Sequence, residues 1–572
     1  MANADLAKLL YEIADLLELL DVAWKPIAYR KAARSIESLN MDVSELHQKK
    51  GLEGIKEISG VGPGIAGKIV EYINTGTIGE LKKLVASAPK GVEQFMHVPG
   101  VGPKKALVIA KALRVSTIAD LERACNEHKV CKIKGFGEKS EADILRGISI
   151  KTKGKDRVLL GAILPIAREL ADHLRTHPAV QKLEIAGSIR RMKETCKDID
   201  FLVLSKKPKA VMDYFTTLHE VKHVLAKGDT KSTVILNSNI QADVRVLDEK
   251  SFGAALQYFT GSKDHNVALR SLAIKKGMKL SEYGLFDRKG SYLAGTTEQD
   301  VYLKLGLSYV EPELREATNE INIARQGTLP QLIPYNALKG DLHMHTTWSD
   351  GSHTTENMIR AALALGYEYI AITDHSRSER VARGLDVKRL LQHKKEVEQL
   401  RKKYDDITIL FGSEVSIKPD GTLDYPGKIL KELDWVIASV HSRFKSPPEE
   451  MTKRIIRAVQ HPSVHALGHP TGRILLARDP YAVYLDKVAS AAAERGVALE
   501  INSSPGRLDL SDANIRLAKS HHAKFVINTD SHSTDQMKYM ELGIAQARRG
   551  WLEVKDVINT LPLKKFLKVI QH

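Results

Sequence analysis

Seven short apolar segments, each predicted to be a strand, alternate with helical patterns after residue 338. They read GDLHMHT, YIAITDH, TILFGSE, WVIASVH, VHALGHP, VALEIN and KFVINTDSH. Strands that alternate regularly with helices form parallel sheets. Seven such units predict a parallel barrel, so this pattern fixes the C-terminal part of the chain as an α/β domain.

Six of the seven segments have His, Asp or Glu at their last or next-to-last position. The carboxyl ends of parallel barrel strands share one face, where active sites lie. A single strand-end histidine is more often only hydrogen-bonded, but ten polar groups on one rim would repel one another or lack partners without a cation. His343 and His345 are two apart in an extended segment and project to one side. The expected metal site draws on His343, His345, Asp350, Asp374, His375, Glu414, His441, His469, Asp530 and His532.

The composition is that of a soluble, multidomain protein. A chain of 572 residues is too long for one core, and we expect about three to five units. No apolar run reaches the length of a membrane span, and three cysteines without C-x-x-C spacing indicate a reducing compartment. We therefore expect a cytoplasmic protein without a membrane partner. The net charge of +16 points to a polyanionic partner such as nucleic acid, although the excess is spread along the chain.

Three similar stretches near the N-terminus each place a Gly-apolar-Gly turn before an amphipathic helix. They are EISGVGPGIAGKIVEYI (57–73), HVPGVGPKKALVIAKAL (97–113) and a weaker KIKGFGEKSEADILRGI (132–148). Such turns and the helix N-termini that follow can meet a phosphate with backbone N–H groups. A lone turn of this kind is usually only a packing unit, but three in a basic chain predict contact with a nucleic-acid backbone. The stretches resemble helix-hairpin-helix elements.

A second candidate metal site lies in the middle of the chain. Asp198 and Asp200 stand two apart at the start of an extended run, and Asp243 lies in QADVRVL, where apolar residues alternate away from it. Three carboxylates on neighbouring strands can hold two Mg²⁺ ions for phosphoryl transfer. The pair alone is a weak signal, and GSIRR upstream strengthens it because a glycine turn, a hydroxyl and two arginines can bind a triphosphate.

The C-terminal metal-ligand set resembles the PHP (polymerase and histidinol phosphatase) domain. The matching signatures are H-x-H, T-D-H, a strand-end Glu, S-V-H, G-H-P and D-S-H. The resemblance implies phosphoester hydrolysis with three divalent ions, Mn²⁺ or Zn²⁺, which suit nitrogen and oxygen ligands. It assigns His343, His345, Glu414 and Asp530 to one ion, Glu414 with His441 and His469 to the second, and Asp350, His375 and His532 to the third. Asp374 would orient a ligand histidine.

The preceding region resembles family X DNA polymerases. The matching stretches are G-S followed by D-x-D, QYFTGSKDHNVALR, SEYGLF, WKPIAYRKAARSIESL and SGVGPGIAGKI. Family X followed by PHP is the layout of the bacterial and archaeal members, and the similarity covers essentially the whole chain. The implied fold is a multidomain one, α+β and α/β: a helical helix-hairpin-helix N-terminal region, a nucleotidyltransferase palm with its C-terminal subdomain, and a (β/α)7 PHP barrel.

The resemblance also assigns roles to single residues of the polymerase part. It makes the palm aspartates the ligands of Mg²⁺ or Mn²⁺, with Asp243 also placed to deprotonate the primer 3′-hydroxyl. The nucleotide would be bound by Arg157, Ser188, Arg191, Tyr258, Phe259, Gly261, Asn266 and Arg270, and DNA phosphates by Lys25, Gly60, Gly62, Gly64, Lys68, Gly100 and Gly102.

Four residues bear on how far the family pattern holds. Met192 and Lys197 stand where relatives have glycine, which could weaken triphosphate affinity. Lys68 occupies the position of the lysine that forms a Schiff base in eukaryotic relatives with deoxyribose-phosphate lyase activity, but Glu80 stands where a phosphate-binding lysine is expected. Because a lyase lysine needs a lowered pKa, we favour Lys68 as a plain phosphate-contacting or solvated lysine.

The expected domains follow from these motifs. They are an end-binding, lyase-like domain (1–85), a helix-hairpin-helix DNA-binding subdomain (86–150), the palm (151–248), the nucleotide-selecting subdomain (249–318), a linker (319–337) and the PHP domain (338–572). The expected function is gap filling with dNTPs on gapped or nicked DNA in base-excision or break repair, with 3′→5′ exonuclease activity, by a monomer. The resemblance further suggests cleavage at abasic sites and removal of 3′-phosphates. Two alternatives stay open: a PHP nuclease with an impaired polymerase core, and a non-catalytic DNA-end-binding scaffold.

Overall fold

A computed structural model of the chain divides into two compact units. One comprises residues 1–156 and 267–278, and the other residues 157–266 and 279–572. The structure describes residues 157–571 without a break and, before them, residues 2–19, 22, 24–37, 43–58, 60–75, 77–87, 92, 95, 98, 101, 103–133, 135–138, 140, 141, 144, 145 and 148. Within these residues, none of the helices has both the length and the apolar character that a bilayer span requires.

The N-terminal unit is helical, as the Gly-rich turns and amphipathic stretches predict. Its helices are α1 (Ala2–Leu19), α2 (Lys25–Glu37), α3 (Val43–Lys56), α4 (Pro63–Thr75), α5 (Gly79–Ser87), α7 (Pro103–Leu113) and α8 (Ile118–Asn126). Helix α4 begins with proline directly after a glycine turn, a favoured arrangement because the first helical N–H needs no partner. Two separate apolar clusters, one around Leu10 and Ile69 and one around Phe95 and Ile109, form its cores.

A five-stranded mixed sheet forms the palm. Its order is β2 (Lys182–Ile185), β4 (Asp198–Leu204), β7 (Gln241–Leu247), β6 (Lys231–Leu236) and β5 (Val221–Lys227), with only β4 and β7 parallel. Strand β5 is not among the predicted strands. Helices α10 (Leu160–Arg175) and α12 (Pro208–Thr217) contribute to the core on one face of the sheet. Helix α13 (Phe252–Thr260) packs with Leu202 on the other face, so the palm aspartates share a face with α13.

The short turn that carries GSIRR joins the sheet to two small strands. Helix α11 (Gly187–Arg190) follows β2, and β3 (Thr195–Cys196) pairs with β1 (Val158–Leu159). The subdomain after the palm contains α14 (Lys263–Lys275), which crosses between the two units, β8 (Lys279–Ser281), β9 (Gly284–Phe286), β10 (Tyr292–Ala294), α15 (Glu298–Lys304) and η1 (Pro312–Leu314). The segment expected as a linker, 319–337, holds α16 (Glu320–Gln326), and its Ile333 is buried in the barrel core.

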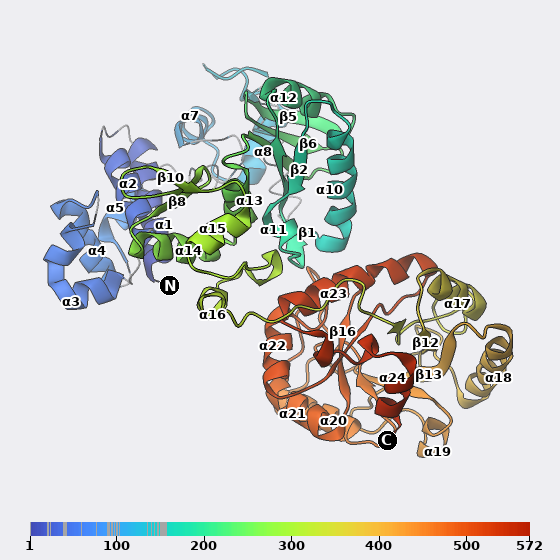
Figure 1. Ribbon diagram of the computed structural model, residues 1–572. Coiled ribbons are helices and arrows are strands. Elements are labelled where there is room, and N and C mark those ends of the chain that lie inside the picture. Colours follow the sequence, from blue (N-terminus) through green and yellow to red (C-terminus); the bar gives the residue numbers. More distant parts are fainter. Residues whose placement is uncertain are drawn as a thin grey trace. The chain divides into compact units, whose positions relative to one another are not determined.

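The C-terminal part is a seven-stranded parallel barrel, which confirms the prediction. The strands follow chain order: β11 (Gly340–Asp341), β12 (Tyr369–Ile372), β13 (Thr408–Ser416), β14 (Trp435–Ser439), β15 (Ala466–Leu467), β16 (Ala498–Asn502) and β17 (Phe525–Asn528). A parallel bridge between Met344 and Ser531 brings the first and last strands together. Helices α17 (Thr355–Ala364), α18 (Val387–Lys403), α20 (Pro448–Val459), α21 (Leu485–Arg495), α22 (Asp512–Ser520) and α23 (Met540–Arg549) surround the strands in Figure 1.

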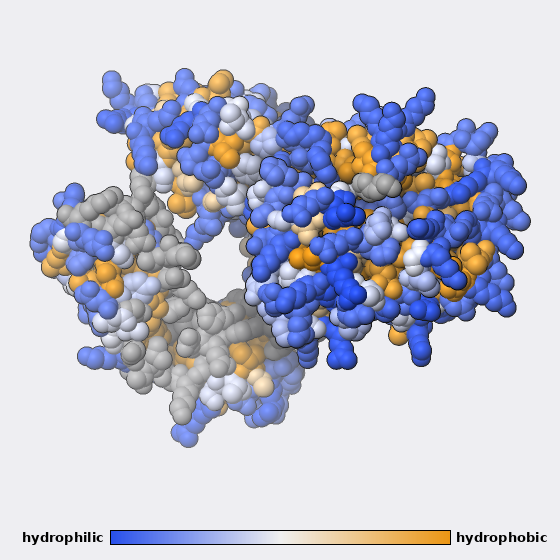
Figure 2. Space-filling view, turned by 90° about the horizontal axis from the view of Figure 1, so that it is seen from below, coloured by the Kyte–Doolittle hydropathy of each residue, from blue (hydrophilic) through white to orange (hydrophobic). Residues whose placement is uncertain are grey.

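The barrel interior is closed at its amino end. Helix α24 (Leu563–Ile570) places Phe566 against Tyr369, with ring centroids 4.4 Å apart. Both belong to an apolar cluster with Leu410, Trp435 and Val526. The opposite, carboxyl end of the strands is therefore left for polar side chains. On the outside, the face in Figure 2 is covered largely by hydrophilic side chains, in keeping with 27% charged residues.

Candidate metal centres of the barrel and the palm

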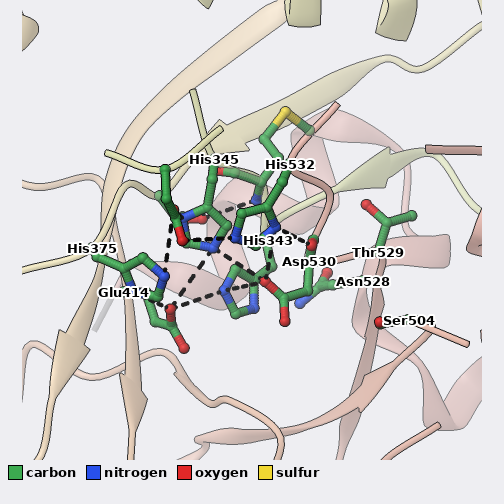
Figure 3. A network of polar contacts seen from close by, with 12 residues as sticks. His343, His345, His375, Glu414, Ser504, Asn528, Thr529, Asp530 and His532 are labelled. Carbon is green, nitrogen blue, oxygen red and sulfur yellow. Dashed lines mark hydrogen bonds and ion pairs between the residues drawn. The ribbon is translucent and has the colours of Figure 1, made fainter. Parts of the chain in front are cut away.

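All nine predicted metal ligands of the barrel come together at the carboxyl ends of its strands. Figure 3 labels His343, His345, His375, Glu414, Asp530 and His532 among them. Glu414, from β13, lies at the centre. Its Oε1 is 3.1 Å from His441 Nε2 and 2.8 Å from His469 Nε2, and its Oε2 is 2.8 Å from His375 Nδ1. Asp530 Oδ1 is 3.1 Å from His345 Nε2. Three groups have ligand atoms all within 4.8 Å of one another: His345, Asp350, His375 and His532; His343, His345 and Asp530; and His375, Glu414 and His441.

These groups fit divalent cations, because several buried polar atoms in them have no hydrogen-bond partner in the described residues. The unsatisfied atoms are His343 Nε2, His345 Nδ1, His375 Nδ1, Glu414 Oε2 and His469 Nδ1. His375 Nδ1 and Glu414 Oε2 lie 2.8 Å apart, but their contact does not have the geometry of a hydrogen bond. An unpaired buried polar atom is costly, and five at one place are explained by ions that take the lone pairs. Nitrogen and oxygen ligands without sulfur suit Mn²⁺ or Zn²⁺.

Carboxylates and imidazoles in the cluster stabilise one another's charged forms. Against the effect of burial, neighbouring carboxylates raise the pKa of His343, His375 and His532, to about 9 for His532, so a bound cation would displace protons from these rings. Burial favours the neutral form of Glu414, but His441, His375 and His343 outweigh it and hold its pKa well below the ordinary value. Burial and the neighbouring His375 and His532 lower the pKa of His345 to about 4, so its imidazole is neutral, the form that binds a metal. The backbone of His469 and Asp530 is strained, with φ angles of 27° and 55°. Strain of this kind is concentrated at functional sites.

Carboxylates behind the ligands hold them in place, and Glu500 is one that the sequence interpretation missed. It is fully buried on β16, accepts a hydrogen bond from His343 Nδ1 at 2.6 Å if that nitrogen carries the proton, and accepts the His469 backbone N–H at 2.7 Å. Asp374 binds the backbone N–H groups of Thr346 and Ser349, at 2.8 and 3.1 Å. Asp374 therefore orients the loop that carries Asp350. It does not orient a ligand histidine through a direct hydrogen bond among the described residues.

Arg507 is a second residue that the sequence interpretation missed. Its Nε lies 3.6 Å from Asp530 Oδ2 at the rim of the ligand cluster, and its side chain is about a quarter exposed. A guanidinium here can approach a phosphate bound at the ions. The surrounding sequence, GRLD (506–509), does not distinguish this arginine from an ordinary surface residue.

The three palm aspartates lie on one face of the sheet, as predicted. Asp200 on β4 stands opposite Asp243 on β7 in the parallel register. Burial, followed by repulsion from Asp198 and Asp243, raises the pKa of Asp200 to about 7, and burial also raises the pKa of Asp198. Among the described residues, these carboxylates are not one of the groups within 4.8 Å. Asp243 accepts hydrogen bonds from Thr233 at 2.5 Å and from Gln241 at 2.7 Å, and Lys231 Nζ lies 3.6 Å from it. A cation would relieve the repulsion between the three carboxylates.

The GSIRR turn lies beside these carboxylates. Gly187 has a φ of 64°, and a Cβ there would stand 2.5 Å from Asp200 Oδ2, so only glycine fits. Ser188 is in the same turn. Arg191 is bound to the Thr260 carbonyl and Glu316. Arg157 is bound to Thr195 on β3.

The predicted sugar- and base-contacting residues lie on α13 and the start of α14. Tyr258 and Phe259 are in edge-to-face contact, with centroids 5.1 Å apart. A Cβ on Gly261 would meet the Arg191 guanidinium at 3.1 Å. Asn266 Nδ2 donates to the Tyr258 carbonyl at 2.6 Å. Arg270 is on the part of α14 that belongs to the other unit.

In the N-terminal unit, Lys25 and the turn at Gly62 and Gly64 are exposed, and Gly60 has a φ of 83°. Gly100 and Gly102 lie outside the described residues. Lys68 is 2.5 Å from Glu80, which also accepts a hydrogen bond from Tyr29. Burial lowers the pKa of Lys68, but its bonds to Glu80 and Tyr29 outweigh burial and raise it.

Known domain families match several parts of the chain. A helix-hairpin-helix domain matches residues 1–78, a SAM-like helix-hairpin-helix tandem residues 52–114 and 92–149, a DNA polymerase beta thumb residues 255–316, and a PHP domain residues 341–504. These matches agree with the separate N-terminal, polymerase and barrel parts of the structure.

Similar proteins cover both the whole chain and the barrel. A protein of Bacillus subtilis (strain 168) called DNA polymerase/3'-5' exonuclease PolX is 38% identical over 568 residues, which is 99% of this chain and 98% of the relative. Probable phosphatases of Thermoanaerobacter sp. (strain X514) and Clostridium acetobutylicum are each 32% identical, over 40% and 34% of this chain and 94% and 78% of their own lengths. The chain belongs to the PolX family, the family X DNA polymerases with a C-terminal PHP domain.

Proposed function

We propose that this protein fills short gaps in DNA with its palm and digests 3′ ends with its barrel, in DNA repair. The observation that carries the proposal is the presence on one chain of two separate clusters of metal-ligand side chains, on the palm face and at the barrel rim. Divalent ions at such sites activate oxygen nucleophiles and neutralise the charge that develops on a phosphodiester. The substrates are gapped or nicked double-stranded DNA and dNTPs.

In the palm, we assign the binding of Mg²⁺ or Mn²⁺ to Asp198, Asp200 and Asp243. Asp243 also accepts the proton of the primer 3′-hydroxyl. Triphosphate is bound by Ser188, Arg191 and Arg157, the sugar by Tyr258, Phe259 and Gly261, and the base pair by Asn266 and Arg270. DNA phosphates meet Lys25 and the turn Gly60, Gly62 and Gly64, and through the resemblance alone Lys68, Gly100 and Gly102.

In the barrel, we assign the nine converging ligands to three ions, Mn²⁺ or Zn²⁺. The ligand oxygens and nitrogens hold the ions, and Glu500 fixes the ring of His343. Arg507, beside Asp530, offers a cation for the phosphate to be cleaved. Its partial exposure leaves it accessible to a DNA end.

A duplex with a one-nucleotide gap tests the polymerase activity directly. With Mn²⁺ and a single complementary dNTP, the primer should grow by one nucleotide, and without dNTP a 3′-labelled strand should shorten. Shortening without any incorporation would favour the alternative in which Met192 and Lys197 leave an impaired core. Neither reaction would favour a non-catalytic DNA-end scaffold.

Removal of 3′-phosphates is a second activity of the barrel that one observation favours. The barrel is 32% identical to probable phosphatases over almost their whole length. A gap bounded by a 3′-phosphate should become extendable after incubation with the protein and Mn²⁺. Release of inorganic phosphate, measured on the same duplex, checks the step.

Metal-dependent incorporation is expected to weaken as the pH falls. The pKa of Asp200 is about 7 without a metal, so below this pH a proton competes with the cation for the carboxylate. The Mg²⁺ concentration for half-maximal incorporation should rise up to about tenfold between pH 7 and pH 6. An equal Mg²⁺ requirement at pH 6 and pH 8 would contradict this expectation.

Lyase activity through Lys68 is expected to be weak. Its bonds to Glu80 and Tyr29 raise its pKa, and a protonated amine cannot attack an aldehyde. Borohydride should therefore trap little covalent complex with an abasic duplex that carries a 5′-deoxyribose phosphate. Strong trapping that disappears in Lys68→Ala would show the opposite.

A further inference from the structure

Side chains of the barrel form hydrogen bonds with the palm turn that is proposed to bind triphosphate. The turn ends at Arg191 and continues through Met192, Lys193 and Glu194 to β3. Helix α23 of the barrel supplies Arg549, whose Nη1 donates to the Arg191 carbonyl at 2.8 Å and to Glu316 Oε1 at 3.1 Å. The same Glu316 oxygen accepts Arg191 Nε at 3.0 Å. The carboxylate of Glu316 therefore links Arg549 of the barrel to Arg191, the arginine assigned to triphosphate binding.

The next residues of this segment are bound to the barrel as well. Glu194 Oε1 accepts hydrogen bonds from Gln546 on α23, at 2.8 Å, and from Arg473, at 2.6 Å. Arg473 follows the ligand His469 by four residues. Met192 is buried in a cluster that also contains Leu542 of α23, and its φ is 52°. Met192, which stands where relatives have glycine, therefore packs this segment into the apolar cluster that contains Leu542.

These contacts are buried, which gives them a fixed geometry. Arg549 and Gln546 are each 1% exposed, and Arg549 is held on its other side by Asp512 at the start of α22. The side chains of Arg191 and Glu316 are 13% and 18% exposed. Removing Arg549 would take the donor away from the Arg191 carbonyl and would leave Glu316 paired with Arg191 and Lys193, so the balance of charges that holds Arg191 in place would change.

We infer that Arg549 is a positioning residue for nucleotide incorporation, and that Gln546 and Arg473 support it by holding Glu194. The barrel thereby acts as a scaffold for the palm, in addition to its own chemistry. Arg549 does not contact the nucleotide; it fixes the backbone and the side chain of Arg191 through Glu316. The inference rests on the proposed triphosphate role of Arg191.

The test compares steady-state incorporation by the full chain in Arg549→Gln, Glu316→Gln and Arg191→Ala. Because misplacing a binding group by about 1 Å can cost about a hundredfold, Arg549→Gln should raise the KM for dNTP about tenfold or more. Glu316→Gln should raise the KM for dNTP to a similar extent. The KM of the double variant, Arg549→Gln with Glu316→Gln, should be little higher than that of either single variant. Digestion of a 3′-labelled strand by the barrel should not change.

Glu541→Gln provides the matched control. Glu541 is on the same helix and pairs with Arg168 of the palm, but both side chains are substantially exposed. The KM of Glu541→Gln for dNTP should equal that of the wild type. If Arg549→Gln lowers the unfolding midpoint, the KM for dNTP of Glu316→Gln tests the same link, because Glu316 is the partner of Arg549.

Three outcomes would overturn the inference. An unchanged KM in Arg549→Gln and Glu316→Gln, with a raised KM in Arg191→Ala, would overturn the inference alone. An unchanged KM in all three variants would overturn it together with the proposed role of Arg191. A rise in Glu541→Gln equal to that in Arg549→Gln would show a general loosening of the domains and would also overturn it.

Discussion

Asp200→Asn should lower nucleotide incorporation by about a thousandfold or more and leave 3′-end digestion intact. Asp200 shares the palm face with Asp198 and stands opposite Asp243, and burial, followed by repulsion from these two carboxylates, raises its pKa to about 7. An amide keeps the volume but removes one anionic ligand. Losing several kcal/mol of charge stabilisation by the ions corresponds to about a thousandfold in rate. Single-nucleotide incorporation on a gapped duplex, measured under single-turnover conditions, gives the rate.

Asp213→Asn is the control for this substitution. Asp213 is on α12, on the side of the sheet away from the aspartates, where it pairs with Lys227 at the surface. The surface pair contributes little, and incorporation should stay at the wild-type rate. If Asp200→Asn incorporates nucleotides as fast as Asp213→Asn, the palm carboxylates are not the catalytic ligands.

Glu414→Gln should abolish digestion to a similar extent, about a thousandfold or more, and leave incorporation intact. Glu414 lies within 4.0 Å of five histidines, whereas Asp350 and Asp530 each approach three. The amide cannot bridge two cations as a carboxylate does. The loss is measured as the rate of shortening of a 3′-labelled strand with Mn²⁺, and the number of bound ions per chain should fall with it.

Glu432→Gln is the corresponding control in the barrel. Glu432 follows α19 (Gly427–Leu430) on the outside and pairs with Lys394 at 2.7 Å. Digestion should be unchanged there. Retained digestion in Glu414→Gln would place the hydrolytic site elsewhere in the chain.

The barrel and the gathering of its ligands could be predicted because both follow from local pattern. Each predicted ligand except Asp350 stands at or just past the end of an apolar strand, and parallel strands in chain order bring these ends to one rim. Glu500 was missed because the predicted segment VALEIN continues past it, whereas the predicted segment TILFGSE ends at Glu414. Only the fold shows that the Glu500 carboxylate reaches His343.

The contacts between palm and barrel could not be predicted because they join residues far apart in the chain. Nothing near Arg549 marks its partner Glu316, and Gln546 resembles any helical glutamine. Met192 was singled out as a departure from a family glycine, but its burial depends on which side chains surround it in the fold. Strand β5 was missed because most of its side chains are exposed and its pattern is weak.

Anomalous diffraction from crystals grown with Mn²⁺ tests the central claim most directly. The account predicts peaks within bonding distance of Glu414, Asp530 and the surrounding histidines, and, with gapped DNA and a dNTP bound, a further peak among Asp198, Asp200 and Asp243. Absence of manganese from either cluster in that complex would contradict the assignment of two metal-dependent phosphodiester sites to this chain.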